Sequence, residues 1–331
     1  MSLSDDEPAF GRTVDGYRSE LRVHCYRMLG SFTDAEDLVQ ETLLRAWRAR
    51  ASFEGRSSLR AWLYRIATNA CLDMLRSHPE RVVPVGDAGD PAPSEIPWLQ
   101  PYPDRLLDEV VPGREEPAAL IVARETIELA YLAAIQLLPA NQRAVLILRD
   151  VLDFSAAETA GLLDTSVASV TSALQRARAT LKQHRPHEPD EWAPPVEPSA
   201  EERRLLRRYM DAHARADSAA LVAMMCEDVR FTMPPQPTLF QGRAALAGFF
   251  ADAFGGAAAR DFRLVPTRAN RHPAAANYVR GPGDTRFRAV SVDVLRFENG
   301  QLAEITTFDT SLFHLFGLPD VLPETDLPAT D

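Results

Sequence analysis

Apolar residues recur at helical spacing in several stretches of the first 185 residues. The stretch 59–76 predicts one amphipathic helix, which Ser58 can cap and Pro79 ends. Its apolar face consists of residues three or four apart: Leu63, Ala67, Ala70 and Met74. A second stripe is polar and holds Arg65, Asn69, Asp73 and Arg76. Such a stripe, with Trp62 and Tyr64 nearby, can take phosphates, a base edge and a stacked base, although a solvated helix face is the plainer interpretation.

Two further helices are predicted before this one. Residues 10–30 form the first, which ends at Gly30, and Thr33 with Glu36 matches a capping box that opens the second. The second helix is predicted to bury a face made of Val39, Leu43, Ala46 and Trp47. Acidic residues lie mostly on its outward side: Asp34, Glu36, Asp37 and Glu41. They exceed what capping needs, so a basic partner surface is a reasonable second interpretation beside stabilisation of the helix dipole.

Residues 79–117 are rich in proline and acidic residues and predict an extended linker with little regular structure. Trp98, Leu99, Leu106 and Leu107 within it suggest that the linker docks on a surface.

Residues 118–185 are predicted to be helical again, starting with one helix from Ala118 to Leu138. A capping box at 155–158, a turn at 163–165 and a cap at Ser166 define two helices in the helix-turn-helix pattern. The second helix should turn five residues inward: Val167, Val170, Leu174, Ala177 and Leu181. Its outward residues suit base edges and phosphates: Thr171, Ser172, Gln175, Arg176 and Arg178. A plain helix-packing unit is the alternative.

A second proline-rich linker covers residues 186–199, and an α+β domain is predicted for residues 200–320. Helices are expected to about Arg215, from Asp217 to Cys226, and at 243–253; strands are expected at 229–233, 262–268, 274–280, 286–297 and 301–309. Asn299-Gly300 predicts a hairpin turn. A curved antiparallel meander on helices would enclose a pocket. Its candidate residues are Phe249, Asp293, Phe308 and Asp309, with Phe240 and Phe297 as further lining residues. The alternative is that both acids face solvent and the phenylalanines are core.

The bulk properties narrow the function. The 331 residues carry a net charge of −11, which argues against a free-standing, non-specific nucleic-acid binder. Cys25, Cys71 and Cys226 are far apart and show no metal-ligand spacing, so we expect no disulfide framework, no metal and no cofactor. The acidic N-terminus lacks a signal-peptide core and no apolar run is long enough to span a bilayer, so we expect a cytoplasmic protein that does not contact a membrane.

Four stretches in order resemble the extracytoplasmic-function (ECF) group of bacterial sigma-70-type RNA polymerase sigma factors. They are DAEDLVQET at 34–42, WLYRIATN at 62–69, LPANQR at 138–143 and LQRAR at 174–178. Residues 200–320 resemble the SnoaL-like polyketide-cyclase fold, which is related in shape to ketosteroid isomerase, through element order and the closing FGLP at 316–319. The resemblance implies a multidomain fold, with two all-α sigma domains followed by a cone-shaped α+β domain. Region 2 would cover 10–78 and region 4 would cover 118–185, with linkers at 79–117 and 186–199.

The same resemblance assigns roles. The helix with Asp34, Asp37, Gln40 and Glu41 would bind the β′ clamp helices of core RNA polymerase, region 4 would meet the β flap, and the acidic linker would run toward the RNA exit path. Arg65, Asn69 and Arg76 would read the minus-ten promoter element, with Asn69 at a flipped-out base. The outward residues of the helix-turn-helix would read the minus-thirty-five element.

The resemblance also implies a sigma factor whose last domain regulates it in cis, with a small-molecule ligand as one means of doing so. No nucleotide loop or nucleophile triad is visible in the sequence, so we do not expect an enzyme. A stand-alone helix-turn-helix regulator, or a bifunctional protein with an enzymatic C-terminal domain, are the alternatives.

Overall fold

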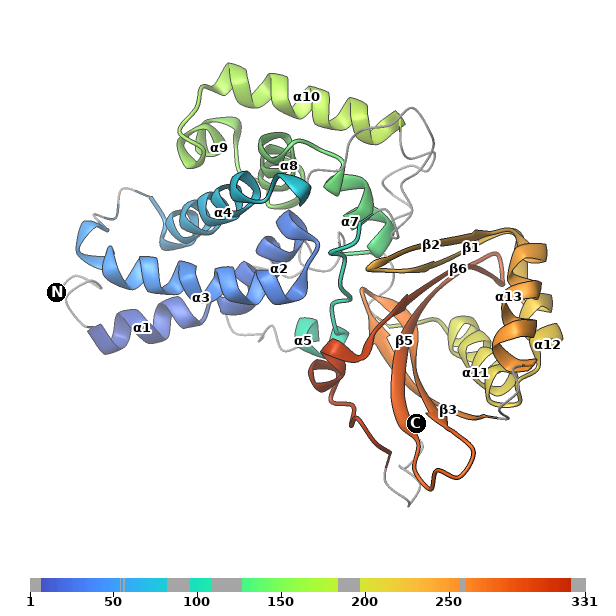
Figure 1. The fold of residues 1–331 in the computed structure, drawn as a ribbon. Coiled ribbons are helices and arrows are strands. Elements are labelled where there is room, and N and C mark those ends of the chain that lie inside the picture. The colour runs from blue at the N-terminus through green and yellow to red at the C-terminus, as the bar shows by residue number, and fades with distance from the viewer. Residues whose placement is uncertain are drawn as a thin grey trace. The chain divides into compact units, whose positions relative to one another are not determined.

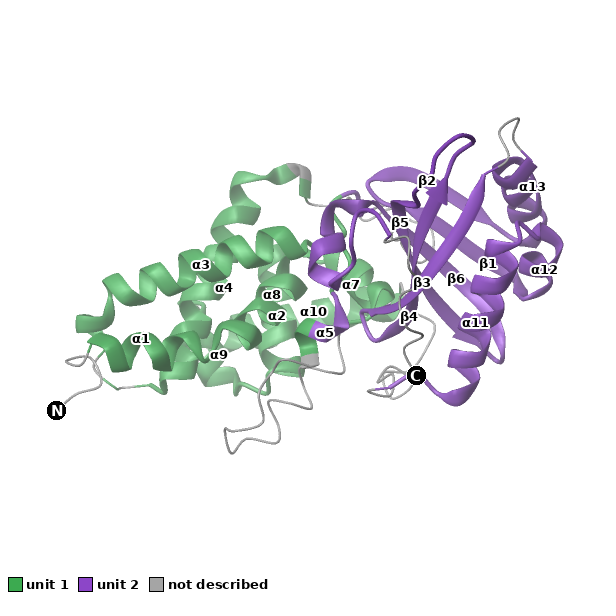
Figure 2. Ribbon diagram, turned by 90° about the horizontal axis from the view of Figure 1, so that it is seen from below, with its two compact units in different colours: residues 1–91, 98–102, 106–193 green, residues 92–97, 103–105, 194–331 purple. Residues whose placement is uncertain are grey.

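The computed structural model describes residues 7–53, 55, 57–81, 96–108, 127–183, 197–255 and 260–322. These fall into two compact units, coloured green and purple in Figure 2. Unit 1 holds residues 1–91, 98–102 and 106–193, and unit 2 holds residues 92–97, 103–105 and 194–331.

Unit 1 is helical (Figure 1). Its longer helices are α1 (Glu7–Asp15), α2 (Arg18–Leu29), α3 (Phe32–Arg48), α4 (Leu59–Ser77), α7 (Leu129–Gln136), α8 (Ala140–Leu146), α9 (Ala156–Leu162) and α10 (Val167–Gln183). Short helical turns lie at η1 (Arg50–Ser52), η2 (Pro79–Arg81) and η4 (Ile147–Val151), and the short helix α5 (Asp104–Asp108) has its first two residues in unit 2 and the rest in unit 1. The all-α character expected for this half of the chain is confirmed.

Several helix ends differ from the sequence predictions. The predicted helix over 10–30 is two helices, because the chain breaks between Asp15 and Arg18. The second ends as predicted at Gly30, which adopts a left-handed φ of 71°. The predicted capping box at Thr33 is wrong, since Ser31 is the N-cap and its hydroxyl accepts from the Asp34 amide. The helix expected to start at Ala118 is described only from Leu129, and residues 109–126 lie outside the described part.

A buried arginine joins helices of unit 1 that are far apart in sequence. Arg143 on α8 is 1 % exposed and donates to the main-chain carbonyl of Met28, at the end of α2. It also donates to the carbonyl and side-chain oxygens of Gln136 and to the Leu138 carbonyl. Helices α2 and α4 therefore share one interior with α7, α8 and α9.

The described part of the first linker is packed. Leu99, Leu106 and Leu107 are buried, as docking predicted, and Trp98 is half-buried. Tyr102 lies within unit 1, with its ring 5.0 Å from those of Tyr26 and Phe32. The expectation of little regular structure is wrong at 79–81 and 104–108, which form short helices. Residues 82–95 and 184–196 lie outside the described part.

Unit 2 is an α+β domain, as expected. Its helices are α11 (Ala200–Ala214), α12 (Ser218–Ala223), α13 (Arg243–Gly255) and the turn η6 (Thr310–Phe316). Its strands are β1 (Met225–Met233), β2 (Gln236–Gln241), β3 (Asp261–Ala269), β4 (His272–Arg280), β5 (Arg288–Glu298) and β6 (Gln301–Phe308). The strand order is β2-β1-β6-β5-β4-β3.

Strands β3 to β6 form the antiparallel meander that the sequence predicted, but the sheet extends beyond it. Strand β1 pairs in parallel with β6, and β2 was missed. The second helix stops at Ala223, so Cys226 lies in β1. The hairpin between β5 and β6 is as predicted, with Asn299 and Gly300 both at positive φ.

Helices cover one face of the sheet and η6 covers part of the other. Helix α11 packs on β3 and β4, and α13 packs on β1 and β2. Val292 and Val294 of β5 are buried on the opposite side from Ser291 and Asp293, where β5 meets η6. The buried acid therefore lies on the helix-covered side of the strand.

Among the described residues, no helix combines the length and apolar character needed to cross a membrane.

Candidate promoter-reading helices and a buried pocket

Helix α4 buries one face and carries a polar stripe on another face. Ser58 fixes its first turn by accepting from the Ala61 amide over 3.1 Å, as predicted. Leu63, Ala67 and Ala70 are buried. The polar stripe holds two exposed arginines and a half-buried asparagine: Arg65, Arg76 and Asn69. The structure thus brings these three candidates onto one helix surface.

Tyr64 is not available to stack a base. It is buried, with its ring 5.0 Å from that of His24 and 5.7 Å from that of Phe154, and burial raises the pKa of its hydroxyl. Trp62 is half-buried and packs near Phe10 and Phe53. The base-stacking role suggested for Tyr64 is therefore wrong.

Asp73 competes for one of the predicted phosphate contacts. Its carboxylate lies 2.8 Å from Nη2 of Arg76 and 3.6 Å from Nη1 of Arg45. Arg76 would have to leave this surface pair to meet a phosphate, at a modest free-energy cost because exposed pairs contribute little.

Helix α10 has the two faces that its sequence predicted, with one exception. Ser166 caps it, and Val170, Leu174 and Ala177 are buried. Val167 was expected to face inward, but it is 47 % exposed, because it lies in the first turn after the cap. The outward side carries four exposed residues and the half-buried Ser172: Thr171, Gln175, Arg176 and Arg178.

Two of these polar residues already have side-chain partners. Arg178 makes two hydrogen bonds to the carboxylate of Asp150, over 2.9 and 2.7 Å. Arg176 donates to the Ser172 hydroxyl over 2.6 Å. The side chain of Gln175 is exposed and has no hydrogen-bond partner within the described ranges. No sequence pattern pointed to Asp150 as a partner, because it is 28 residues from Arg178.

On helix α3 the candidate polymerase-binding residues separate into two groups. Asp37 and Gln40 are exposed, and Glu41 pairs with Arg45 over 2.8 Å. Asp34 forms a part-buried ion pair with Arg81, which fits a structural role. The structure therefore leaves Asp37 and Gln40 as the most accessible members of this set.

An apolar groove lies beside these acids and was not predicted. Trp47 was expected to be buried, but it is 37 % exposed, and Leu44 is more exposed still. A hollow of about 370 Å³ is lined by residues of α1, the first residue of α2 and residues of α3: Phe10, Gly11, Val14, Asp15, Arg18, Gln40, Leu43, Leu44 and Trp47. An exposed tryptophan and leucine beside acidic residues is typical of a protein-binding surface.

Unit 2 contains a cavity of about 590 Å³, within the range of small-molecule sites. Phe249, Asp293, Phe308 and Asp309, the four pocket candidates, all contribute to its lining. Phe240 and Phe297 do not line it; they pack against the hydrophobic core of the domain. The expectation that both acids face solvent is wrong for Asp293, which is 3 % exposed, while Asp309 is exposed.

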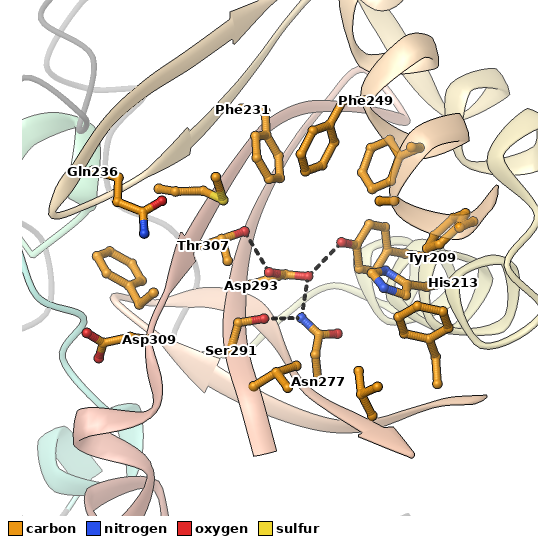
Figure 3. Close-up of a pocket in the computed structure, with 18 of the residues that line it drawn as sticks. Tyr209, His213, Phe231, Gln236, Phe249, Asn277, Ser291, Asp293, Thr307 and Asp309 are labelled. Carbon is orange, nitrogen blue, oxygen red and sulfur yellow. Dashed lines mark hydrogen bonds between the residues drawn. The ribbon is translucent and has the colours of Figure 1, made fainter. Parts of the chain in front are cut away.

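The carboxylate of Asp293 is the centre of a buried network (Figure 3). Its Oδ2 accepts from the Tyr209 hydroxyl over 2.8 Å and from Asn277 Nδ2 over 2.7 Å, and its Oδ1 accepts from the Thr307 hydroxyl over 2.7 Å. Asn277 Nδ2 also donates to Ser291 over 2.9 Å. These bonds satisfy a polar group that would otherwise destabilise the interior.

His213 completes the polar part of the cavity. It lies one turn after Tyr209 on α11, with its ring 5.1 Å from that of Phe254 and 5.3 Å from that of Phe262. Desolvation lowers its pKa, although Asp293 opposes the shift, so the ring is neutral at pH 7.

Tyr209, His213 and Asn277 were missed by the sequence interpretation. Tyr209 and His213 are four residues apart on a helix, so their spacing put them on one face. Asn277 pairs with Ser291, and Asp293 pairs with Thr307, but that register exists only once the strands are aligned. Within the described ranges, no group of three or more His, Cys, Asp or Glu side chains is placed to hold a metal ion.

Comparison with known proteins gives the class to which this chain belongs. The Sigma-70 region 2 family matches residues 13–80, the Sigma-70 region 4 family matches residues 128–181, and the SnoaL-like domain matches residues 206–305. The chain is 41 % identical over 322 residues to the ECF RNA polymerase sigma factor SigG of Mycobacterium tuberculosis, covering 95 % of this chain and 85 % of SigG. It belongs to the ECF RNA polymerase sigma factors and carries a C-terminal SnoaL-like domain.

Two further relatives delimit the match. The ECF sigma factor SigW of Bacillus subtilis is 32 % identical over 178 residues, which cover 54 % of this chain and 89 % of SigW. The crystal structure of the Mycobacterium tuberculosis ECF sigma factor SigJ aligns with a TM-score of 0.56 at 22 % identity, covering 96 % of this chain and 100 % of SigJ. SigJ thus shares the fold of this chain.

Proposed function

We propose that this sigma factor binds core RNA polymerase through α3 and reads promoters with α4 and α10, and that its C-terminal cavity takes a small molecule that regulates transcription. We keep the boundaries 10–78 and 118–185 for the two sigma regions and 200–320 for the last domain. The cytoplasm, where polymerase and DNA meet, is the expected place of action.

The observation that supports promoter reading most directly is the polarity of α10. One face is buried through Val170, Leu174 and Ala177, and the other presents Gln175 and Arg176. A helix anchored by an apolar face can lie in the major groove, where glutamine and arginine pair with adenine and guanine edges. Arg176→Ala should therefore weaken recognition of the minus-thirty-five element by about 1–3 kcal/mol.

Run-off transcription and gel shifts with reconstituted holoenzyme test this role. Gln183→Ala, an exposed change at the end of α10, is the matched control and should leave promoter affinity unchanged. If Arg176→Ala binds promoters of different minus-thirty-five sequence as the unmodified protein does, α10 is not the reader. Tight, specific promoter binding without polymerase would instead favour a stand-alone helix-turn-helix regulator.

Helix α4 supports minus-ten recognition through Asn69. Its amide lies on the same stripe as Arg65 and Arg76, so it can contact a base edge while arginines hold phosphates. Asn69→Ala should reduce open-complex formation, measured by permanganate reactivity of the melted strand, while affinity for core polymerase stays unchanged. An equal loss of both would contradict the assignment.

The cavity in unit 2 supports the ligand proposal. Its volume of about 590 Å³, its phenylalanine walls and its buried Asp293 match the apolar pockets with few polar groups that bind small molecules. Regulation in cis requires that occupancy change transcription. Run-off assays with and without a bound molecule test this, and no change at saturation would contradict it.

A further inference from the structure

The cavity of unit 2 buries a negative charge without a cationic side chain beside it. Asp293 is held by Tyr209, Asn277 and Thr307, all neutral donors. Across the described part of the chain, no lysine, arginine or histidine forms an ion pair with Asp293. Hydrogen bonds reduce the free-energy cost of burying a carboxylate, but a counter-charge would reduce it further.

The neighbouring polar groups supply no compensating positive charge. His213 does not compensate the charge, because burial lowers its pKa and keeps the ring neutral. Asn277 directs its amide NH₂ to Asp293 and Ser291, so its Oδ1 points away and is buried without a partner. That orientation is fixed by the carboxylate, which can accept only from the nitrogen side of the amide.

Charged residues at the exposed rim do not supply a net charge. Arg260 and Asp309 both line the cavity and both are exposed. Their charges are opposite, and solvent screens them. The inner end of the cavity is therefore the part whose charge discriminates among ligands.

Phenylalanine side chains make up a large part of the remaining wall. Six phenylalanines line the cavity: Phe231, Phe249, Phe250, Phe254, Phe262 and Phe308. The rings of Phe231 and Phe249 lie 4.8 Å apart, and Figure 3 shows the two together on one side of Asp293. Aromatic faces attract cations and bury apolar rings, so they suit a ligand that combines both.

We propose that the cavity binds an organic cation, with an apolar ring system among the phenylalanines and an ammonium or protonated heterocyclic nitrogen donating to Asp293. The inference rests on the proposed small-molecule site and adds the chemical class of its ligand. A neutral hydroxyl can use the same acceptor but leaves the buried charge uncompensated. An anion is repelled.

Three probes that differ in charge but share one ring system test the proposal. They are 1-naphthylmethylamine, 1-naphthylmethanol and 1-naphthoate, titrated calorimetrically into the full chain at neutral pH. The amine should bind at least about tenfold more tightly than the alcohol, a difference of about 1.4 kcal/mol, and naphthoate should bind most weakly.

Two variants and one matched control separate charge from shape. Asp293→Asn keeps the side-chain size and should reduce the preference for the amine over the alcohol to less than about threefold. Asp252→Asn, an exposed carboxylate of α13 outside the cavity lining, should leave that preference intact. Phe249→Leu keeps an apolar wall but removes an aromatic face, so it should weaken the amine more than the alcohol. If Asp293→Asn does not fold, Phe249→Leu and the comparison of the three probes still test the proposal.

The outcomes are distinct. The proposal is overturned if the alcohol or naphthoate binds as tightly as the amine, or if Asp293→Asn retains the preference. In those cases the cavity remains a small-molecule site of another class. If none of the three probes binds, the cation assignment fails, and binding of small molecules at this cavity loses its support as well. Run-off transcription tests the sigma function separately and is independent of each result.

Discussion

The guanidinium of Arg143 donates to the main-chain carbonyl of Met28 over 2.5 Å, and this bond ties α8 to the C-terminal end of α2. Arg143→Met should lower the free energy of unfolding by about 2–4 kcal/mol, because it leaves several buried acceptors without a donor. Urea unfolding followed through tryptophan fluorescence measures it. Arg176→Met, at an exposed site, should change stability by less than about 0.5 kcal/mol. Equal losses would show that the buried bonds do not matter.

Arg178 makes two hydrogen bonds to Asp150, so the contact with DNA phosphate that we propose for it would compete with this neighbour. Asp150→Asn should strengthen binding of holoenzyme to a minus-thirty-five fragment by about two- to fivefold at low salt, because it frees a cation near the backbone. Asp153→Asn changes the net charge equally at an exposed site nearby and controls for that effect. The role of Arg178 is refuted if both variants behave alike.

Asp37 is the acidic residue of α3 most open to a basic partner, since Asp34 is occupied by Arg81. Asp37→Arg should weaken affinity for core polymerase by about tenfold through charge repulsion. Titration of labelled core polymerase measures it, with Asp252→Arg in unit 2 as the control. Unchanged affinity would remove α3 from the polymerase contact.

His24 makes unit 1 sensitive to acid. Desolvation, with Arg27 and Arg60 nearby, lowers its pKa to about 3, against 6.5 for a free histidine. The unfolded chain takes up a proton below pH 6.5 but the folded chain does not until about pH 3, so stability falls as pH falls through that window. The expected contribution of His24 is a loss of about 2 kcal/mol between about pH 7.5 and about pH 5.

Urea unfolding at about pH 7.5 and about pH 5, followed through tryptophan fluorescence, tests this loss of stability. His24→Gln should show a smaller loss than the unmodified protein, whereas His314→Gln, at an exposed position, should show the full loss. An identical pH dependence in all three proteins would exclude His24 as the cause.

Helix ends were predicted well where one side chain decides them. Ser58, Ser155 and Ser166 cap the helices that they were expected to cap, because a cap bonds to an amide two or three residues away. The break between Asp15 and Arg18 and the cap at Ser31 were missed. Apolar spacing continues across that break, and serine, threonine and aspartate at 31–34 offered several competing caps.

The sequence grouped candidate residues correctly on helix faces. It did not predict correctly which of these side chains are exposed. Gln175 and Arg176 share the exposed side of α10 as their spacing predicted. Tyr64 was expected to be accessible but is buried, and Val167 was expected to be buried but is exposed. Whether a helix position is covered depends on what packs there, and Phe154, which meets Tyr64, is 90 residues away in the sequence.

The sequence by itself determined most of the element order, most helix faces and the family, because periodicity, caps and motif wording are local properties of the chain. Only the tertiary structure decided that β1 pairs in parallel with β6, that Asp150 holds Arg178, and that Asp293 points into a cavity. Alternation of side chains along β5 assigns them to its two faces but does not show on which face the helices pack. In this domain both faces are covered. The network of Tyr209, Asn277 and Thr307 around Asp293 joins residues up to 84 positions apart, so it exists only once α11 lies on the sheet.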